Sequence, residues 1–220
     1  MEKSLIKPFI AKRVAQEFTD GMVVNLGIGL PVLCTNYLPE GIHVTVHSEL
    51  GIVGQGPAPD AEHADPMHVV DAGGSPSSVV LGGAFTDSSD SFALIRGGHV
   101  DAVVLGGLEV DEEGSLANWI IPGKKMPGMG GAMDLCVGSK HCIVCMEHTA
   151  KGNPKLFEKC RLPLTASHCV NKIITEMCVI EVTENGFLMT EINPEFTVEQ
   201  VKAATAAPLT VSGNLKSMLD

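Results

Sequence analysis

The sequence predicts an α/β protein whose open, mostly parallel sheet has helices on both faces. Short apolar segments of strand length alternate with segments of helical periodicity along most of the chain. Only 19% of the residues are charged and 45% are hydrophobic, which fits a sheet that is buried on both sides. Many of the 24 glycines follow the predicted strands, where the chain must turn. The length of 220 residues suits a single domain spanning 1–220.

The N-terminal part is predicted to form a helix, a strand, a loop, a short helix and a second strand. Five apolar residues at three- and four-residue spacing predict a helix that Asp20-Gly21 ends; they are Ile6, Phe9, Ile10, Val14 and Phe18. A strand is predicted over 22–26, and a loop over 27–31 leads into a helix that opens at Pro31. The next strand, 44–47, runs into Glu49 and a glycine-rich loop that reaches residue 59.

The rest of the chain continues the alternation and then changes character. Strands are predicted over 69–71, 79–81, 101–105 and 141–146, with a helix over 88–96 and a long loop over 123–131. The turn Glu184-Asn185-Gly186 joins 177–182 to 186–190 in a hairpin, which adds an antiparallel edge to the sheet. Thr197 and Gln200 form a capping box for a helix to about residue 204, before a last strand over 209–211.

Charge and hydropathy argue against several classes of partner. The formal net charge of −11 is unsuited to nucleic acid or to an anionic membrane surface. The longest uncharged stretch, 21–39, contains glycines and prolines that prevent one continuous membrane-spanning helix. The first eighteen residues carry six charged side chains and lack the apolar core of a signal peptide. We therefore expect a cytoplasmic protein.

The cysteines are expected to be core thiols, and no metal site is expected. Seven cysteines, an odd number, without an export signal predict free thiols in a reducing compartment. Cys142 and Cys145 form a CxxC, but positions i and i+3 of a strand face opposite sides of the sheet and cannot share one ion. No second CxxC or HxxxH is present. The acidic run 109–113 lacks the spacing of a calcium loop and is expected to be solvated.

Three loops are expected to meet beyond the carboxyl ends of the strands, where ligands bind in such sheets: 27–31, 48–59 and 123–134. The pair Gly27 and Gly29 lacks the third glycine of a dinucleotide fingerprint, so a tight turn or a wall of backbone amides is the better interpretation. Lys124 and Lys125 lack phosphate-loop spacing and are interpreted as a solvated turn. Glu49, at a strand tip before glycines, is the candidate for chemistry.

Several stretches, in order along nearly the whole chain, resemble the family I CoA-transferases. The stretch 47–57, which begins His47-Ser48-Glu49-Leu50-Gly51, resembles the family's Ser-Glu-Asn-Gly signature, and 25–31 resembles its first strand and loop. Residues 122–135 resemble its glycine-rich active-site loop, and 116–119 and 188–192 also fit. The chain is most similar to the B (beta) subunit of enzymes of the 3-oxoacid or short-chain acyl type, including those that use acetoacetate.

The resemblance implies an activity and a set of site residues. Glu49 would be the nucleophile that carries coenzyme A as a glutamyl thioester while it passes from a short-chain acyl-CoA to acetate, butyrate or acetoacetate. Gly130 and Gly131 would supply backbone N–H groups to the oxyanion, with Gly27 and Gly29 as a second wall. Asn118 would orient a polar group, although a plain turn residue fits equally well.

The resemblance also implies a partner and a substrate: coenzyme A would act as a substrate, no cofactor would be bound permanently, and an alpha-type partner would complete a hetero-oligomer. His47 is interpreted as a packing or hydrogen-bonding residue. Leu50 departs from the family's asparagine, which leaves the substrate subclass open.

Three other functions are alternatives to a catalytic CoA-transferase subunit. The first is a non-catalytic ligand-binding domain of the same broad fold, which sugar-phosphate isomerases also have. The others are an acyl-CoA hydrolase and a scaffold whose partner holds the active site.

Overall fold

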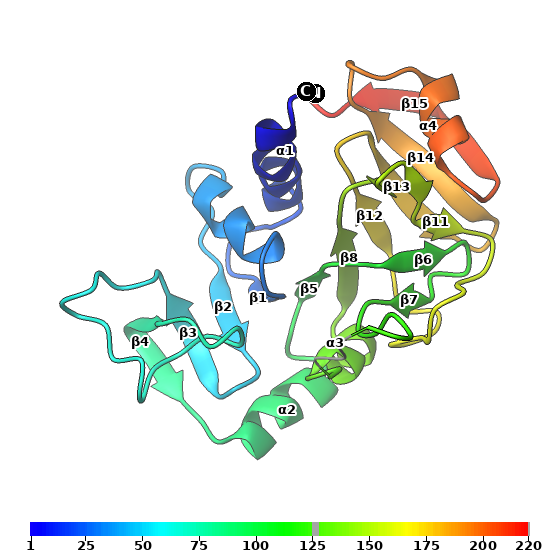
Figure 1. Cartoon of the computed structure of the whole chain (residues 1–220). Helices are drawn as coiled ribbons and strands as arrows, with labels where there is room; N and C mark the ends of the chain where they lie inside the picture. The colour runs from blue at the N-terminus through cyan, green and yellow to red at the C-terminus, as the bar shows by residue number, and fades with distance from the viewer. Residues whose placement is uncertain (125–127, 220) are drawn as a thin grey trace.

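The computed structural model describes residues 1–124 and 128–219 as a large sheet with helices on both faces (Figure 1). The sheet has ten strands in the order β15-β14-β13-β12-β8-β5-β1-β2-β3-β4. Its strands are β1 Val23–Leu26, β2 Thr45–Ser48, β3 Ile52–Gly56, β4 Ser78–Phe85, β5 Ala102–Leu105, β8 His141–Cys145, β12 Lys172–Ile174, β13 Cys178–Thr183, β14 Gly186–Ile192 and β15 Leu209–Ser217. The five central strands, β12, β8, β5, β1 and β2, are parallel to one another, as predicted.

Alternate residues of the central strands enter two separate cores, one on each face. On β5, Val103 belongs to one core and Val104 to the other, because successive side chains of a strand point to opposite faces. The first core lies against α2 Ser88–Arg96, α3 Ala132–Gly138 and α4 Val198–Ala204. The second lies against α1 Lys3–Ala15 and the 3₁₀ helix η1 Pro31–Tyr37. Cys142 and Cys145 enter different cores, which confirms that this CxxC does not point to one side.

Several predicted boundaries shift in the structure. The first helix ends at Ala15 rather than near Phe18, although Phe18 still packs into the core. The expected loop after Glu49 contains strand β3, which the glycine-rich sequence conceals. Gly51 and Gly54 lie in the left-handed region at φ +118° and +84°, so the glycines shape a tight return and a bulged strand. The sheet therefore has antiparallel strands at this edge also.

The C-terminal hairpin is confirmed as β13 and β14, but it is not the edge of the sheet. The last strand, β15, pairs parallel to β14 and lies outside it. It is also much longer than the predicted 209–211. The capping box at Thr197 is confirmed, since Thr197 Oγ1 accepts from the Gln200 amide and the Gln200 side chain accepts from the Thr197 amide.

The prediction that the acidic run 109–113 is solvated is wrong for its first part, which is buried. Glu109 and Asp111 lie on β6 Glu109–Asp111, which pairs with β7 Leu116–Ala117 and β11 Leu156–Phe157 in a small sheet. Glu109 is 5% exposed and accepts hydrogen bonds from the backbone N–H groups of Arg161 and Leu162. Backbone donors from distant loops satisfy these carboxylates, so they need no solvent.

The remaining elements are a two-stranded pair, β9 Thr149–Ala150 with β10 Asn153–Pro154. Within the described residues, no helix has both the length and the apolar character needed to cross a membrane.

Candidate active site

Glu49 lies at the carboxyl end of the central parallel strands, as expected. Strand β2 ends at Ser48, and Glu49 follows directly in the turn to β3. The neighbouring strand β1 carries Asn25, which pairs in register with His47 on β2. The sequence places Asn25 and Glu49 far apart along the chain, and the parallel register brings their side chains together.

A hydrogen-bonded network holds the Glu49 carboxylate. Asn25 Nδ2 donates to Glu49 Oε2 at 3.1 Å and lies 3.3 Å from His47 Nδ1. Because the amide nitrogen is only a donor, His47 Nδ1 accepts, and Nε2 carries the proton toward Ser91 Oγ at 2.9 Å. Ser91 Oγ in turn donates to the Ser48 carbonyl. His47 therefore has the hydrogen-bonding role predicted for it.

The network is buried around its histidine. Asn25, His47 and Ser91 are 1%, 2% and 0% exposed, whereas Glu49 is partly exposed. Burial lowers the pKa of His47, and the Glu49 charge only partly offsets this effect. A neutral imidazole keeps one acceptor and one donor, which this network requires.

Two polar atoms beside Glu49 have no hydrogen-bond partner. Asn25 Oδ1 and Ser48 Oγ are buried, and nothing among the described residues bonds to either. Buried polar atoms are almost always paired, so each unpaired atom is a position where a ligand or a water can bind. Both atoms belong to residues next to Glu49 in sequence or in the sheet.

Glu49 lines a cavity of about 310 Å³ that opens beside the first glycine loop. Its lining residues are Leu26, Ile28, Gly29, Val32, Leu33, His47, Ser48, Glu49, Gln55, Asp71, Ala72, Gly73 and Ser75. A second cavity, of about 450 Å³, shares Leu26, Gln55 and Asp71 with it, among others. The two form adjoining hollows over β1, β2 and β3, and neither is lined by Lys or Arg among the described residues.

The long glycine loop also reaches Glu49, as predicted. A Cβ placed on Gly131 would lie 3.1 Å from Glu49 Cγ and 3.0 Å from Phe92 Cζ, so only glycine fits without displacement. Within the described residues, no backbone carbonyl accepts a hydrogen bond from the Gly130 or Gly131 amide. Lys125, of the predicted lysine pair, lies outside the described residues, and Lys124 is exposed.

Two other predicted residues have different surroundings. The Gly27 amide donates to the Val104 carbonyl at 2.8 Å, so this N–H is already used and does not serve an oxyanion. A Cβ at Gly27 would meet Leu105 and Val104 at 3.2 Å, which explains the glycine by close packing against β5. Gly29, with φ +89°, remains on the wall of the Glu49 cavity.

Asn118 bridges two loops through its side chain. Its Oδ1 accepts from Thr165 Oγ1 at 2.6 Å, and its Nδ2 donates to the Gly106 carbonyl. Both ends of the amide are used to join two loops, and Asn118 lines neither cavity beside Glu49. Asn118 therefore orients two loops away from Glu49, and its predicted role at the site stays a prediction.

Sequence reasoning did not single out Asn25, Ser91 or Phe92. Asn25 had a detectable signal, because a polar residue interrupts an otherwise apolar strand. Ser91 and Phe92 had none, since α2 is an ordinary amphipathic helix, and only its packing against α3 brings them to the site.

Known proteins resemble this chain in sequence over nearly its whole length. The family model "Coenzyme A transferase" matches residues 8–204. The beta subunit of the acetate CoA-transferase of Escherichia coli K12 is 52% identical over 212 residues, which cover 96% of each chain. The corresponding subunit of a probable succinyl-CoA:3-ketoacid coenzyme A transferase of Bacillus subtilis is 46% identical and covers 92% of this chain and 94% of its own.

Solved structures share the fold at low sequence identity. An acyl-CoA transferase of Escherichia coli O157:H7 has a TM-score of 0.73 at 21% identity, and this chain spans 43% of it. The decarboxylase AibA/AibB has a TM-score of 0.71 at 19% identity, so the fold alone does not fix the reaction. The family match and the close relatives show that the chain belongs to the coenzyme A transferase family and is a transferase.

Proposed function

We propose that this chain transfers coenzyme A between short-chain acyl groups through a thioester on Glu49. One observation carries the proposal: Glu49 has one carboxylate oxygen held by Asn25, while its side chain lines a cavity and lies beside Gly131. A nucleophile needs an available oxygen, a fixed orientation and nearby donors for the developing oxyanion, and these contacts supply all three.

The proposed steps balance without oxidation and without net proton transfer. A Glu49 oxygen attacks the thioester carbonyl of acyl-CoA, the C–S bond breaks, and CoA leaves as a thiolate. The thiolate attacks the glutamyl carbonyl of the resulting anhydride, so the acyl group departs as a carboxylate and a glutamyl-CoA thioester remains. An acceptor carboxylate then reverses both steps and frees Glu49. The Gly130 and Gly131 amides would stabilise each tetrahedral oxyanion.

The cavity lining supports a small monocarboxylate substrate. The walls are mainly apolar, with His47, Ser48, Gln55 and Ser75 as polar groups and Asp71 as the other acid besides Glu49. No Lys or Arg among the described residues lines either hollow, so a second carboxylate on the substrate would meet Asp71 without a compensating lysine or arginine charge. We therefore propose acetate, butyrate and acetoacetate as the substrate class.

A partner chain is part of this proposal. Relatives that match over nearly their full length are named as beta subunits, which supports an alpha-type partner for this chain. Because the described residues place no Lys or Arg in either hollow, the phosphates of coenzyme A need cations from elsewhere. A partner surface that closes over the glycine loops would supply them.

The test is a covalent adduct. The assembled enzyme is incubated with acetoacetyl-CoA or butyryl-CoA and no acceptor acid, then its intact mass is measured and the adduct is mapped. We expect one coenzyme A per chain on Glu49, and none in Glu49→Gln. An active enzyme without an adduct would exclude this route. Release of CoA without an acceptor, at the rate seen with one, would identify a hydrolase instead.

A further inference from the structure

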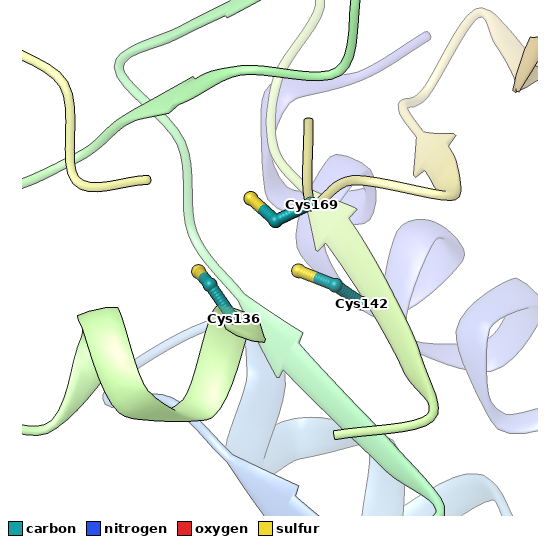
Figure 2. Close-up of side chains that lie close together, drawn as sticks. All are labelled: Cys136, Cys142 and Cys169. Atoms are coloured by element: carbon teal, nitrogen blue, oxygen red, sulfur yellow. The ribbon is translucent and has the colours of Figure 1, made fainter. Parts of the chain in front are cut away.

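Three cysteine side chains from separate elements converge beneath the sheet. Cys136 comes from α3, Cys142 from β8, and Cys169 from the segment that leads into β12 (Figure 2). Their sulfur atoms all lie within 4.8 Å of one another. All three thiols are free. The sequence spacing conceals this group, because the ligand-like pair Cys142 and Cys145 faces two different cores.

The group is closed on one side and reachable on the other. Cys136 and Cys142 are 3% and 1% exposed, while Cys169 is partly exposed. The Cys169 sulfur lies 3.7 Å from the Gly114 carbonyl oxygen and 3.9 Å from that of Ala166. Cys169 is therefore the most exposed of the three thiols, and its sulfur lies beside two backbone carbonyl oxygens.

The sulfur spacing fits one ion. Zinc–sulfur bonds are about 2.3 Å long, so three thiolates around one zinc lie roughly 3.8–4.0 Å apart. Sulfur separations within 4.8 Å reach that arrangement with side-chain movements below about 1 Å. Isolated core cysteines behave as small apolar residues, but nothing about apolar packing requires three thiols to point at a common centre.

We propose that Cys136, Cys142 and Cys169 bind one thiophilic divalent cation of the zinc type. Three thiols lose three protons to solvent, three metal–sulfur bonds form, and no electron is transferred. The bound group carries a net charge of −1, which costs less to bury than the −2 of the same thiolates with a monovalent copper ion. The fourth coordination position faces the exposed side of Cys169.

The site would hold α3 in place. Cys136 lies in the last part of α3, and Gly131, which lies beside Glu49, immediately precedes its first residue. An ion bound to Cys136 ties this helix to β8 and to the segment before β12. Metal binding is therefore expected to stabilise the fold, and this expectation does not depend on the mechanism proposed for Glu49.

The test titrates the reduced, metal-free full chain with Cd²⁺ and Co²⁺, followed by competition with Zn²⁺. We expect one ion per chain by native mass spectrometry, thiolate-to-metal charge-transfer absorption, release of three protons and a rise in the melting temperature. Absence of the charge-transfer band at millimolar Cd²⁺, or a band with fewer than three protons released, would overturn the proposal.

Matched variants locate the ion. Cys169→Ala removes the partly exposed thiol, and we expect the Cd²⁺ affinity to fall by about 100-fold or more. Cys160→Ala removes another partly exposed thiol that lies outside the group, and affinity should change by less than about twofold. Circular dichroism of the metal-free variants checks their folding, and Cys136→Ser gives a second ligand variant. Equal binding by Cys169→Ala and the wild type, or equal loss in Cys160→Ala, would contradict the assignment.

Discussion

Two buried histidines organise polar networks of opposite character. His47 joins Asn25 and Ser91 in a network that ends at Glu49 and a cavity. His148, 0% exposed, lies between Thr175 and Thr205, with Nδ1 and Nε2 at 3.0 and 2.9 Å from the two hydroxyl oxygens. Beside Glu49, the first network leaves Asn25 Oδ1 and Ser48 Oγ without a partner, whereas the unpaired buried atoms of the described residues include none from the second, closed network.

The closed network stabilises the C-terminal half of the sheet. The His148 amide donates to Glu176 Oε2, and Asn193 Nδ2 donates to the Glu176 carbonyl. Thr205 donates in turn to the Val201 carbonyl on α4. Similar residue types thus form a network joined to buried backbone groups in one place and a network that ends at a cavity in the other.

The largest effect on kcat should come from replacing Glu49, the acid at the cavity end of the His47 network. Glu49→Gln keeps the shape and an acceptor for Asn25 but cannot form the thioester, so we expect kcat to fall by at least about 10³-fold. Glu176→Gln is the matched control in the closed network and should retain most of the activity per folded molecule. Steady-state kinetics with purified enzyme measures both, and near-normal turnover by Glu49→Gln would show that the active site lies elsewhere.

Acid should weaken the closed network. Burial lowers the pKa of His148 to about 4 from its ordinary 6.5, so between these values the unfolded chain binds a proton that the folded chain does not. The free energy of unfolding should therefore fall as the pH drops from about 6.5 to 4, with a loss of about 3 kcal/mol in total. Urea unfolding at several pH values measures this slope.

The variant His148→Gln sharpens the same measurement. It has no group at this position that titrates in this range, so its slope between pH 6.5 and 4 should be flatter than that of the wild type by the His148 contribution. The slope is compared rather than the absolute stability, because the variant also changes packing. Identical slopes for the two proteins would mean that His148 does not couple folding to protons.

Two asparagines distinguish positioning from stability. Asn25→Ala frees the Glu49 carboxylate to rotate, and we expect kcat to fall by about 10–100-fold with a small change in KM. Asn193→Ala, in the closed network, should leave kcat nearly unchanged and cost about 1–2 kcal/mol of unfolding free energy. Kinetics and urea unfolding of both variants test the contrast. Equal losses of kcat and equal losses of unfolding free energy in Asn25→Ala and Asn193→Ala would contradict it.

The smallest expected effect concerns Gly131. Gly131→Ala pushes a methyl group against Glu49 and Phe92, and we expect roughly a tenfold loss of kcat. The second change Phe92→Leu shortens one of the two opposing side chains and should restore part of the rate. Gly213→Ala is the control, because a Cβ there has no neighbour within 4 Å. Failure of the double variant to recover would assign the loss to backbone conformation instead.

Much of the fold could be predicted because it depends on local pattern. The continuous apolar run 102–105 predicts a strand buried on both faces, and the capping residues at Thr197 fix where α4 begins. Strand β3 could not be predicted, since Gly54 and Gly56 weaken the strand signal, and its pairing with β2 and β4 supplies the stability that propensity lacks.

By itself, the sequence determined the parallel α/β class, because strand and helix periodicity are written in neighbouring residues, and the resemblance of 47–57 and 122–135 to a known family pointed to Glu49 and the glycine loop. Only the tertiary structure decided which amide holds Glu49, which glycine N–H is already occupied and which three thiols meet. Those contacts join residues far apart along the chain, and they depend on the register of β1 against β2 and on how α3 packs against the sheet.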